Sequence, residues 1–229
     1  MTPFQRYAIY MLPDGPLADL GAEWLGWDVR SGSVVDHPTA DGLQRPVAEL
    51  TDRPRKYGFH GTIKAPFRLK DGTSANVLQD EFATFCAATQ AVTLAKGLSV
   101  NRLGRFLALT PTVPSAALSA LAASSVQSLD LFRAPPSAAE LVRRRKAGLS
   151  ERQDAMLLRW GYPYVMEEFR FHITLTGPLK DTEADQTESA LRTLFAPVLT
   201  APYTIDTLCL VGEAEDGRFR LIDRHTLSG

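Results

Sequence analysis

One short pattern occurs twice in this chain, and the two copies lie about half a chain apart. Residues 57–67 read Tyr-Gly-Phe-His-Gly-Thr-Ile-Lys-Ala-Pro-Phe, and residues 169–179 read Phe-Arg-Phe-His-Ile-Thr-Leu-Thr-Gly-Pro-Leu. Both follow Phe-His-x-Thr-(Ile/Leu)-x-x-Pro-(Phe/Leu), and a polar turn and a helix-like stretch follow each copy. Self-similarity of this kind is typical of a duplicated unit. We therefore expect one domain, residues 1–229, made of two pseudo-symmetric lobes that each carry one His-x-Thr motif.

Each copy of the motif is predicted to be a β-strand. Successive side chains of a strand point to opposite faces, so His60 and Thr62 are expected to share one face. The same alternation places His172 and Thr174 on one face of the second strand. If the two lobes meet face to face, two imidazoles and two hydroxyls converge on one cleft, while the apolar faces pack under helices.

This set of groups suits the cleavage of a phosphodiester. The reaction needs a base for the nucleophile, an acid for the leaving alkoxide and donors for the nonbridging oxygens. Histidine titrates near neutrality, so one of His60 and His172 can act as the base while the other acts as the acid. Thr62 and Thr174 supply uncharged donors to the phosphate. Which histidine is the base is left open by the sequence.

Strands and helices are predicted to alternate along the rest of the chain. The stretch 31–56 has no periodicity and several prolines and glycines, so it reads as an irregular loop that leads to the first motif. Extended stretches are predicted at 6–12, 57–69, 92–100, 106–110, 168–176, 203–211 and 218–224. Helices are predicted at 17–29, 74–89, 115–132 and 182–195, with two shorter ones opening at Ser137 and Ser150.

Further residues near the motifs are candidates for contact with the substrate. Lys64 and Thr176 continue the polar faces at the next alternate position, so Lys64 can attract a phosphate, although a lysine at a strand end can also lie in water. Arg170 shares a face with His172 and is a candidate for substrate binding. Tyrosines near the motifs can contact a base or sugar but pack more often than they bind. These are Tyr57, above all, with Tyr7, Tyr10 and Tyr162.

Charge and cysteine content narrow the partners and the compartment. The formal net charge is −1, so no overall cationic field attracts a long nucleic acid or an acidic membrane, and a small phosphodiester is the expected partner. The side chains of the run Arg143-Arg144-Arg145-Lys146 would point in different directions around a helix. This favours a stretch exposed to solvent over a shaped anion-binding site. The two cysteines, Cys86 and Cys209, lie in apolar stretches and are expected to be buried thiols in a reducing, cytoplasmic compartment.

The paired His-x-Thr motifs resemble those of the two-histidine (2H) phosphoesterase superfamily. Residues 6–10, Arg-Tyr-Ala-Ile-Tyr, and residues 17–26, Leu-Ala-Asp-Leu-Gly-Ala-Glu-Trp-Leu-Gly, are similar to a bacterial branch of it that is associated with phosphonate-use operons. The resemblance spans most of the chain. One position departs from the usual pattern, because Gly61 is smaller than the residue commonly found between the histidine and the threonine.

The resemblance implies a fold and an activity. The expected fold is a bilobal α+β fold with two antiparallel sheets lining a central cleft and helices on the outside. The expected activity is hydrolysis of a small cyclic phosphodiester, such as a ribose cyclic phosphate made during phosphonate breakdown, without metal or cofactor. The resemblance also implies that His60 and His172 are acid and base, and that Thr62 and Thr174 bind phosphate.

Three other functions are considered. Other branches of the superfamily resemble enzymes that hydrolyse or ligate 2′,3′-cyclic or 2′-5′ RNA ends, although tracking RNA favours a basic groove. A non-enzymatic module that binds a phosphorylated ligand would not require a base. A metal site is the third alternative, but neither His-x-Thr has an Asp, Glu or Cys nearby in metal-ligand spacing. The oligomeric state is left open.

Overall fold

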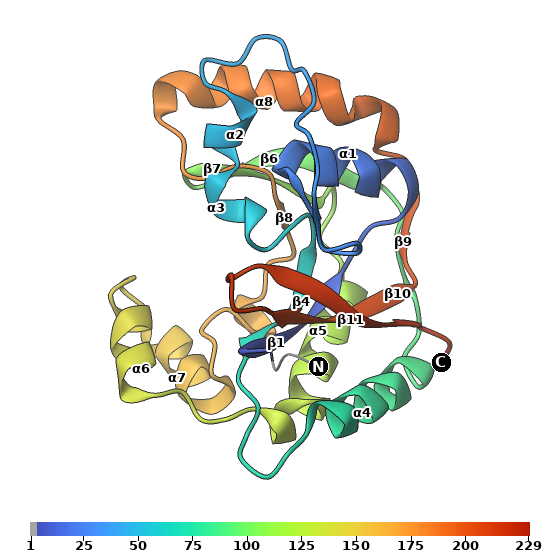
Figure 1. Cartoon of the computed structure of the whole chain (residues 1–229), viewed down its shortest axis with the longest axis vertical. Coiled ribbons are helices and arrows are strands. Elements are labelled where there is room, and N and C mark those ends of the chain that lie inside the picture. The colour runs from blue at the N-terminus through green and yellow to red at the C-terminus, as the bar shows by residue number, and fades with distance from the viewer. Residues whose placement is uncertain (1–3) are drawn as a thin grey trace.

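The computed structural model describes residues 4–229, and its strands form a long antiparallel sheet with the two motif strands side by side in the middle (Figure 1). The strand order is β11-β10-β1-β4-β8-β7-β6. The strands are β1 (Arg6–Met11), β4 (Gly61–Phe67), β6 (Leu98–Leu103), β7 (Phe106–Pro111), β8 (Ile173–Thr174), β10 (Thr207–Glu213) and β11 (Phe219–Thr226). Two small ribbons pair β2 (Trp27–Asp28) with β3 (Ser33–Val34) and β5 (Val92–Leu94) with β9 (Tyr203–Ile205). The predicted α+β fold with antiparallel sheets is confirmed.

The long sheet consists of two halves that meet at one point. Strands β11, β10, β1 and β4 form one half, which combines both ends of the chain, and β8, β7 and β6 form the other. The halves join through a single registered pair, Gly61 of β4 opposite Ile173 of β8. The two expected antiparallel sheets are thus continuous with each other at the motifs, and each half contributes one motif strand to the junction.

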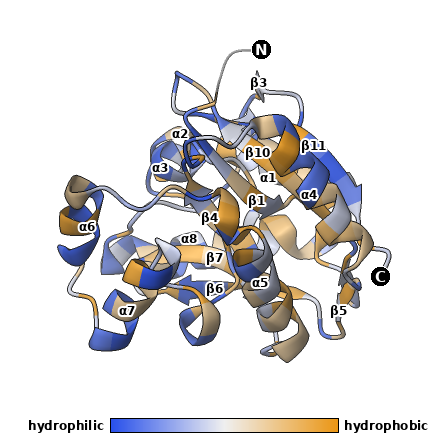
Figure 2. Cartoon of the chain, turned by 90° about the horizontal axis from the view of Figure 1, so that it is seen from below, coloured by the Kyte–Doolittle hydropathy of each residue, from blue (hydrophilic) through white to orange (hydrophobic). Residues whose placement is uncertain are grey.

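Helices cover the two halves and close the core. Helix α5 (Ala116–Ser128) packs against β4, α4 (Ala75–Ala87) against β10 and β11, and α8 (Asp181–Phe195) against β6 and β7. Helix α1 (Gly15–Leu25) follows β1 and buries Trp24 completely. Figure 2 shows that α1, α4 and α5 carry mixed apolar and polar residues, as expected of helices that cover one face of a sheet.

Smaller elements lie around the sheet. Helices α6 (Ala138–Arg145) and α7 (Glu151–Trp160) form an arm at one side of the molecule (Figure 1), and their N-caps are the predicted Ser137 and Ser150. The loop predicted at 31–56 contains β3 and the short helices α2 (Val47–Leu50) and α3 (Asp52–Arg55). Single turns of 3₁₀-helix occur at η1 (Asp130–Phe132), η2 (Met166–Glu168) and η3 (Ala196–Val198).

The second motif strand is shorter than the sequence predicts. The expected strand at 168–176 is reduced to Ile173–Thr174, because the η2 turn ends only at Glu168 and the chain enters the sheet late. Met166, at the start of that turn, has a positive φ of 54°, a conformation that is uncommon for residues other than glycine. His172 therefore lies just before the strand rather than within it.

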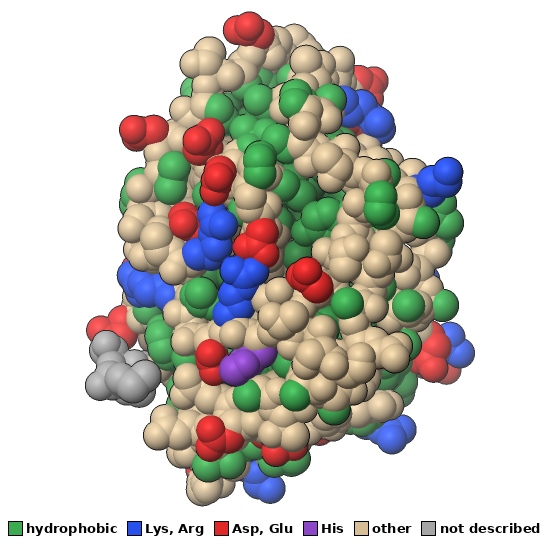
Figure 3. All heavy atoms as spheres, turned by 90° about the vertical axis from the view of Figure 1, so that its right-hand side faces the viewer, with side chains coloured by type: hydrophobic (Ala, Val, Ile, Leu, Met, Phe, Trp, Pro, Cys, Tyr) green, Lys and Arg blue, Asp and Glu red, His purple; other side chains and the backbone are tan. Residues whose placement is uncertain are grey.

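Both cysteines are buried and unpaired, as expected. Burial raises the pKa of the Cys86 and Cys209 thiols to about 12, so neither side chain ionises near neutral pH. Basic and acidic side chains alternate over the face shown in Figure 3, with no continuous basic band across it. Among residues 4–229, no helix is both long enough and apolar enough to cross a lipid bilayer.

Candidate active site

The register between β4 and β8 brings the four motif residues together. Gly61 lies opposite Ile173 in an antiparallel pair, so continuing the register places Thr62 across from His172 and His60 across from Thr174. Side chains opposite each other on one face of such a pair have Cβ atoms about 4.5–5.5 Å apart. All four side chains are half-buried. The strand pairing alone therefore builds a compact cluster of two imidazoles and two hydroxyls.

Both imidazole rings are held in the same way. His60 Nδ1 lies 2.9 Å from the carbonyl oxygen of Gly58, and His172 Nδ1 lies 2.8 Å from that of Arg170. A carbonyl oxygen only accepts hydrogen bonds, so Nδ1 of each ring carries the proton and donates it. In the neutral ring this leaves Nε2 as the basic atom. Each histidine is thus oriented by the backbone two residues before it, with Nε2 directed away from that contact.

The surroundings of His60 favour its neutral form. Its ring stacks on that of Tyr10 with centroids 3.6 Å apart and planes 16° apart, and Tyr10 is 1% exposed. Burial, with a smaller contribution from the neighbouring charge of His172, lowers the pKa of His60 to about 4. The Thr62 hydroxyl donates to Nε2 at 2.9 Å. At neutral pH His60 is therefore an uncharged imidazole with a basic nitrogen facing its motif threonine.

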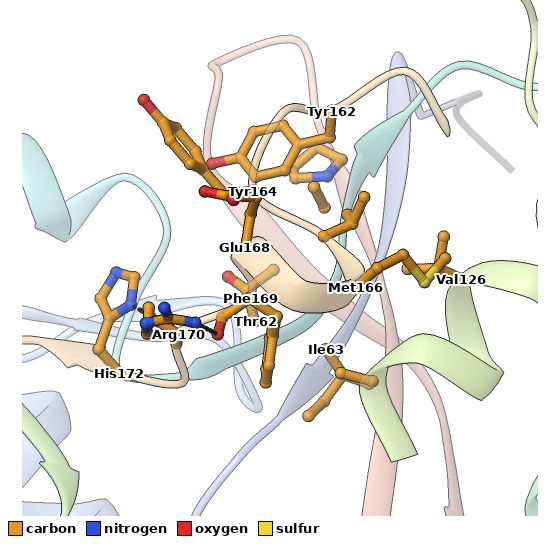
Figure 4. A pocket seen from close by; sticks show the side chains of 14 residues that line it. Thr62, Ile63, Val126, Tyr162, Tyr164, Met166, Glu168, Phe169, Arg170 and His172 are labelled. Atoms are coloured by element: carbon orange, nitrogen blue, oxygen red, sulfur yellow. Dashed lines mark hydrogen bonds between the residues drawn. The ribbon is translucent and has the colours of Figure 1, made fainter. Parts of the chain in front are cut away.

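His172 lines an open cavity of about 250 Å³. Figure 4 shows the side chains that surround this cavity. Arg170 and Thr62 lie beside it at this end of the cavity. The ring of Phe106 lies 5.8 Å from that of His172, centroid to centroid. The floor of the cavity is apolar, and its members include Ile63, Val126, Met166 and Phe169. A substrate in this cavity would have direct access to His172.

Lys64 does not continue the polar face of the first motif strand, contrary to the sequence-based prediction. Thr62 of β4 pairs with Tyr10 of β1, and Lys64 pairs with Ile9. Tyr10 and Ile9 are consecutive, whereas Ile63 lies between Thr62 and Lys64 without a partner, so Ile63 is the extra residue of a β-bulge. The bulge shifts the alternation and turns Lys64 to the other face. There its ammonium is 3% exposed and donates to the backbone oxygen of Val126 at 3.0 Å, and burial lowers its pKa to about 8.

Strict alternation along the strand also predicts the wrong position for the Thr176 side chain. The backbone N–H groups of Leu175 and Thr176 both donate to the carbonyl oxygen of Leu107, at 2.9 and 3.3 Å, as in a β-bulge. The Thr176 hydroxyl is 1% exposed and accepts a hydrogen bond from the backbone N–H of Leu107 at 3.0 Å. The hydroxyl is therefore occupied within the sheet and does not reach the cavity.

Of the other candidates, one lines the cavity and one lies outside it. Arg170 lines the cavity, and one guanidinium nitrogen donates to the backbone oxygens of Glu167 and Phe169. Tyr57 lies outside the cavity, 42% exposed, with its ring centroid 6.5 Å from that of His60. Tyr10 contacts His60 directly, through the stacked rings described above.

Sequence reasoning missed two polar residues of the cavity, besides most of its apolar lining. Tyr164 and Glu168 both line it, beside the tyrosine considered from sequence, Tyr162. All three lie in the segment just ahead of the second motif, which the sequence presents only as a run of aromatic and acidic residues. Their proximity to the motif was the one available signal.

Gly61 is small because an aromatic ring occupies the space over it. A Cβ built there would lie 2.3 Å from the ring of Phe171. We expect Gly61→Ala to lower the free energy of unfolding by about 1–3 kcal/mol, since the added carbon overpacks the junction between the two halves of the sheet. Urea unfolding measures this change, and adding Phe171→Leu to the same chain should restore part of it. An equal loss in the double variant would show that the ring is not the obstacle.

Residues 4–229 contain no cluster of three or more His, Cys, Asp or Glu side chains placed to hold a metal ion. That the reaction needs no metal or cofactor stays a prediction.

Comparison with protein families gives one family match. The family described as "Protein of unknown function (DUF1045)" matches residues 62–220. Two curated relatives named "Ribose 1,5-bisphosphate phosphokinase PhnN" are similar to the chain. The one from Janthinobacterium sp. (strain Marseille) is 41% identical over 93% of this chain, and the one from Laribacter hongkongensis (strain HLHK9) is 32% identical over 94%. These matches cover 48% and 50% of the relatives, so the chain spans about half their length.

Two solved structures match the chain over nearly its whole length. Escherichia coli LigT in complex with 3′-AMP is 16% identical, with 99% of this chain and all of that chain covered, and the TM-score is 0.41. A structure titled as a phosphoesterase is also 16% identical, covering 98% of this chain and 99% of that chain, again with a TM-score of 0.41.

Proposed function

The chain belongs to the DUF1045 family, and from the geometry of its histidine pair we propose that it is a metal-independent phosphodiesterase that hydrolyses a small cyclic phosphodiester. One observation carries the proposal. His60 and His172 each donate Nδ1–H to a backbone carbonyl, so both rings present Nε2, and each faces a threonine across the junction of β4 and β8. This is the arrangement that a base, an acid and two phosphate donors require.

We assign His60 as the base. It is neutral at physiological pH, because burial lowers its pKa to about 4. In the free enzyme the Thr62 hydroxyl donates to Nε2. When substrate binds, that hydroxyl turns to a nonbridging oxygen, and a water molecule takes its place at Nε2. The water oxygen then attacks phosphorus as its proton moves to His60.

His172 is assigned as the acid. In its protonated form it keeps the Nδ1–H contact with the Arg170 carbonyl and offers Nε2–H to the leaving oxygen. The ester P–O bond breaks as the P–O bond to water forms, and the leaving alkoxide takes the proton of His172. Thr62 and Thr174 donate to the nonbridging oxygens, where negative charge grows in the transition state.

The names of the two curated relatives support a ribose ester as the substrate of this chain. The two curated relatives are named for a kinase that acts on ribose 1,5-bisphosphate, and this chain spans half of each. The present sequence contains no Gly-x-x-x-x-Gly-Lys-(Ser/Thr) loop for a nucleotide triphosphate. The kinase name therefore suits the half that this chain does not match. A domain joined to such a kinase fits a neighbouring step on ribose phosphates, such as opening a ribose cyclic phosphate in phosphonate metabolism.

A substrate panel in the presence of EDTA tests the proposal. The panel contains ribose 1,2-cyclic phosphate, 2′,3′-cyclic nucleotides and a 2′-5′-linked dinucleotide. Turnover of a ribose cyclic phosphate that resists EDTA is expected. Preference for the nucleotides would favour the RNA-end alternative, while binding without turnover of any compound would favour the phosphorylated-ligand module.

The pH dependence of kcat/KM reports the base of the free enzyme. We expect the acidic limb near pH 4, because the rate falls only when the neutral His60 of the free enzyme becomes protonated. The measurement is a pH series of kcat/KM at constant ionic strength, from pH 3.5 upward in stable buffers. An acidic limb near the ordinary histidine value of about 6.5 would show that His60 is hydrated in solution.

A further inference from the structure

The two motif histidines lie in equivalent places, but the strands beside them differ at one position. In the order β1-β4-β8-β7, each motif strand has one outer neighbour, β1 or β7. Tyr10 of β1 lies opposite Thr62, and Ala108 of β7 lies opposite Thr174. Tyr10 and Ala108 therefore hold the same position in the two halves of the sheet. One half carries an aromatic ring beside its motif, and the other carries a methyl group.

The ring of Tyr10 lies flat on the imidazole of His60. The two residues are diagonal neighbours across the β1–β4 pair, which is within the reach of an aromatic side chain. Their ring centroids are 3.6 Å apart and their planes 16° apart. His172 has a different neighbour, because the ring of Phe106 lies 5.8 Å away and is tilted by 54°. That ring does not cover a face of His172, which lines the open cavity.

The Tyr10 ring is itself buried and packed. It is 1% exposed, and its centroid lies 5.5 Å from that of the buried Phe219 ring. The charged groups near Tyr10 are Arg6 and Glu213, which bind each other at 2.7 Å and so add little net charge around the stack.

Two more titratable side chains face His60. The ring of Tyr57 lies 6.5 Å from it, centroid to centroid, and His172 lies across the junction of the sheet. Thr62, which donates to Nε2, does not titrate. No carboxylate is hydrogen-bonded to His60 among the described residues, so nothing of that kind holds a proton on its ring.

Cover by an aromatic ring has two opposing effects on the protonation of an imidazole. A cation over a ring face gains a cation–π attraction, which raises the pKa of the histidine by about one unit. Exclusion of water favours the neutral form and lowers the pKa of a fully buried histidine by up to about 3–5 units. The second effect is the larger one, so the Tyr10 ring favours neutral His60.

We propose that Tyr10 is the positioning residue that gives His60 the role of base, by shielding one face of its imidazole from water and by fixing the direction of Nε2. This inference rests on the proposed function. The Nδ1 contact with the Gly58 oxygen and the flat contact with Tyr10 together fix the plane of the His60 ring. In the other half, the small Ala108 supplies no such cover, which suits an acid that must carry a proton.

Titration of His60 in the protein without substrate tests the inference. NMR of protein with ¹⁵N-labelled histidine follows each imidazole through a pH series, and the signals lost in His60→Ala assign His60. In the wild type His60 is expected to stay neutral down to about pH 4. Tyr10→Ala and Tyr10→Val remove the ring, so His60 should titrate at least about one pH unit higher, toward the ordinary value of about 6.5. Valine suits a strand, so Tyr10→Val gives a result even if the alanine variant does not fold.

Kinetics of the same variants give a second readout. The acidic limb of kcat/KM should move upward with the titration of His60 in Tyr10→Val. Its kcat should fall by about tenfold, because Nε2 is no longer held in one direction. Tyr10→Phe keeps the ring, so it should titrate as the wild type does and keep kcat within about threefold.

Tyr7→Val is the matched control. Tyr7 is also a buried tyrosine of β1, but it lies opposite Phe67, away from the histidine cluster. This variant should lose stability while His60 titrates as in the wild type. An unchanged titration in a folded Tyr10→Val or Tyr10→Ala, or an equal change in Tyr7→Val, would overturn the inference and leave the phosphodiesterase proposal standing. The expected titrations in a wild-type protein that hydrolyses no phosphodiester would overturn the proposed function, and with it the catalytic part of the inference.

Discussion

Replacing either His60 or His172 with alanine is expected to lower kcat/KM by about 10³-fold, since general acid-base catalysis supplies about 10²–10⁴-fold per group. The two losses have different causes. His60→Ala removes the neutral nitrogen that takes a proton from water, and His172→Ala removes the donor to the leaving oxygen. Steady-state kinetics on the ribose cyclic phosphate measures both.

The fold should survive these substitutions. Both rings are half-buried at the junction of the sheet, and each makes one hydrogen bond to the backbone, through Nδ1. The His60 ring also stacks on Tyr10 and accepts from Thr62, so its removal leaves a small gap beside Tyr10. His225→Ala is the matched control, because that histidine is also half-buried but pairs with Asp223 at 2.9 Å on β11. A normal rate in either motif variant would refute its catalytic role, and circular dichroism shows whether a dead variant is still folded.

The next largest effects are expected from the motif threonines. Thr62→Val and Thr174→Val keep the shape of the side chain and remove the hydroxyl, which should lower kcat by about 10²–10³-fold if the hydroxyl stabilises the transition-state oxygens. Thr62→Val also removes the donor to Nε2 of His60. Steady-state kinetics should therefore show losses in kcat larger than any change in KM.

Thr176→Val tests whether a threonine outside the histidine cluster behaves differently from the two motif threonines. Its hydroxyl accepts from the buried N–H of Leu107, so the substitution leaves that donor unpaired and should cost about 1–3 kcal/mol of unfolding free energy. Turnover by the folded protein should stay within a few fold of wild type. If Thr176→Val lost as much kcat as Thr62→Val, the bulge would not remove Thr176 from the site.

The sequence predicted the four central residues because their pattern is local and repeated. Two similar strands that pair in antiparallel fashion are enough to place Gly61 opposite Ile173. This pairing brings both histidines close together. The family match places the chain in the DUF1045 family, and the predicted α+β fold with antiparallel sheets is confirmed. The roles of the motif residues remain proposals that the kinetics above test.

The errors at Lys64 and Thr176 come from one assumption, that a strand alternates without interruption. Lys64 and Thr176 each follow a bulge, and a bulge depends on how the partner strand packs, which no local pattern reveals. The length of the second motif strand was overestimated for a similar reason. A turn at Met166, with its positive φ, delays entry into the sheet, although methionine carries no turn signal in sequence.

The lining of the cavity outside the motifs depends on contacts across long sequence separations. Glu168 is oriented by Gln153, and Tyr162 is backed by Arg144 from the preceding arm. The basic run on α6 reads as a solvated helix face from sequence, and most of it is. Only the tertiary placement of α6 shows that one arginine of the run supports the cavity.

The division of labour between the two histidines can be tested most directly by changing the leaving group. An alkyl 4-nitrophenyl phosphodiester releases a stable phenolate that needs no proton from an acid, whereas a base is still needed to activate water. The measurement is kcat/KM of wild type, His60→Ala and His172→Ala on this ester, with EDTA present. His172→Ala is expected to recover to within about tenfold of wild type, and His60→Ala to remain about 10³-fold slower. Recovery by His60→Ala instead, or equal losses in both variants, would contradict the assignment of His60 as base and His172 as acid.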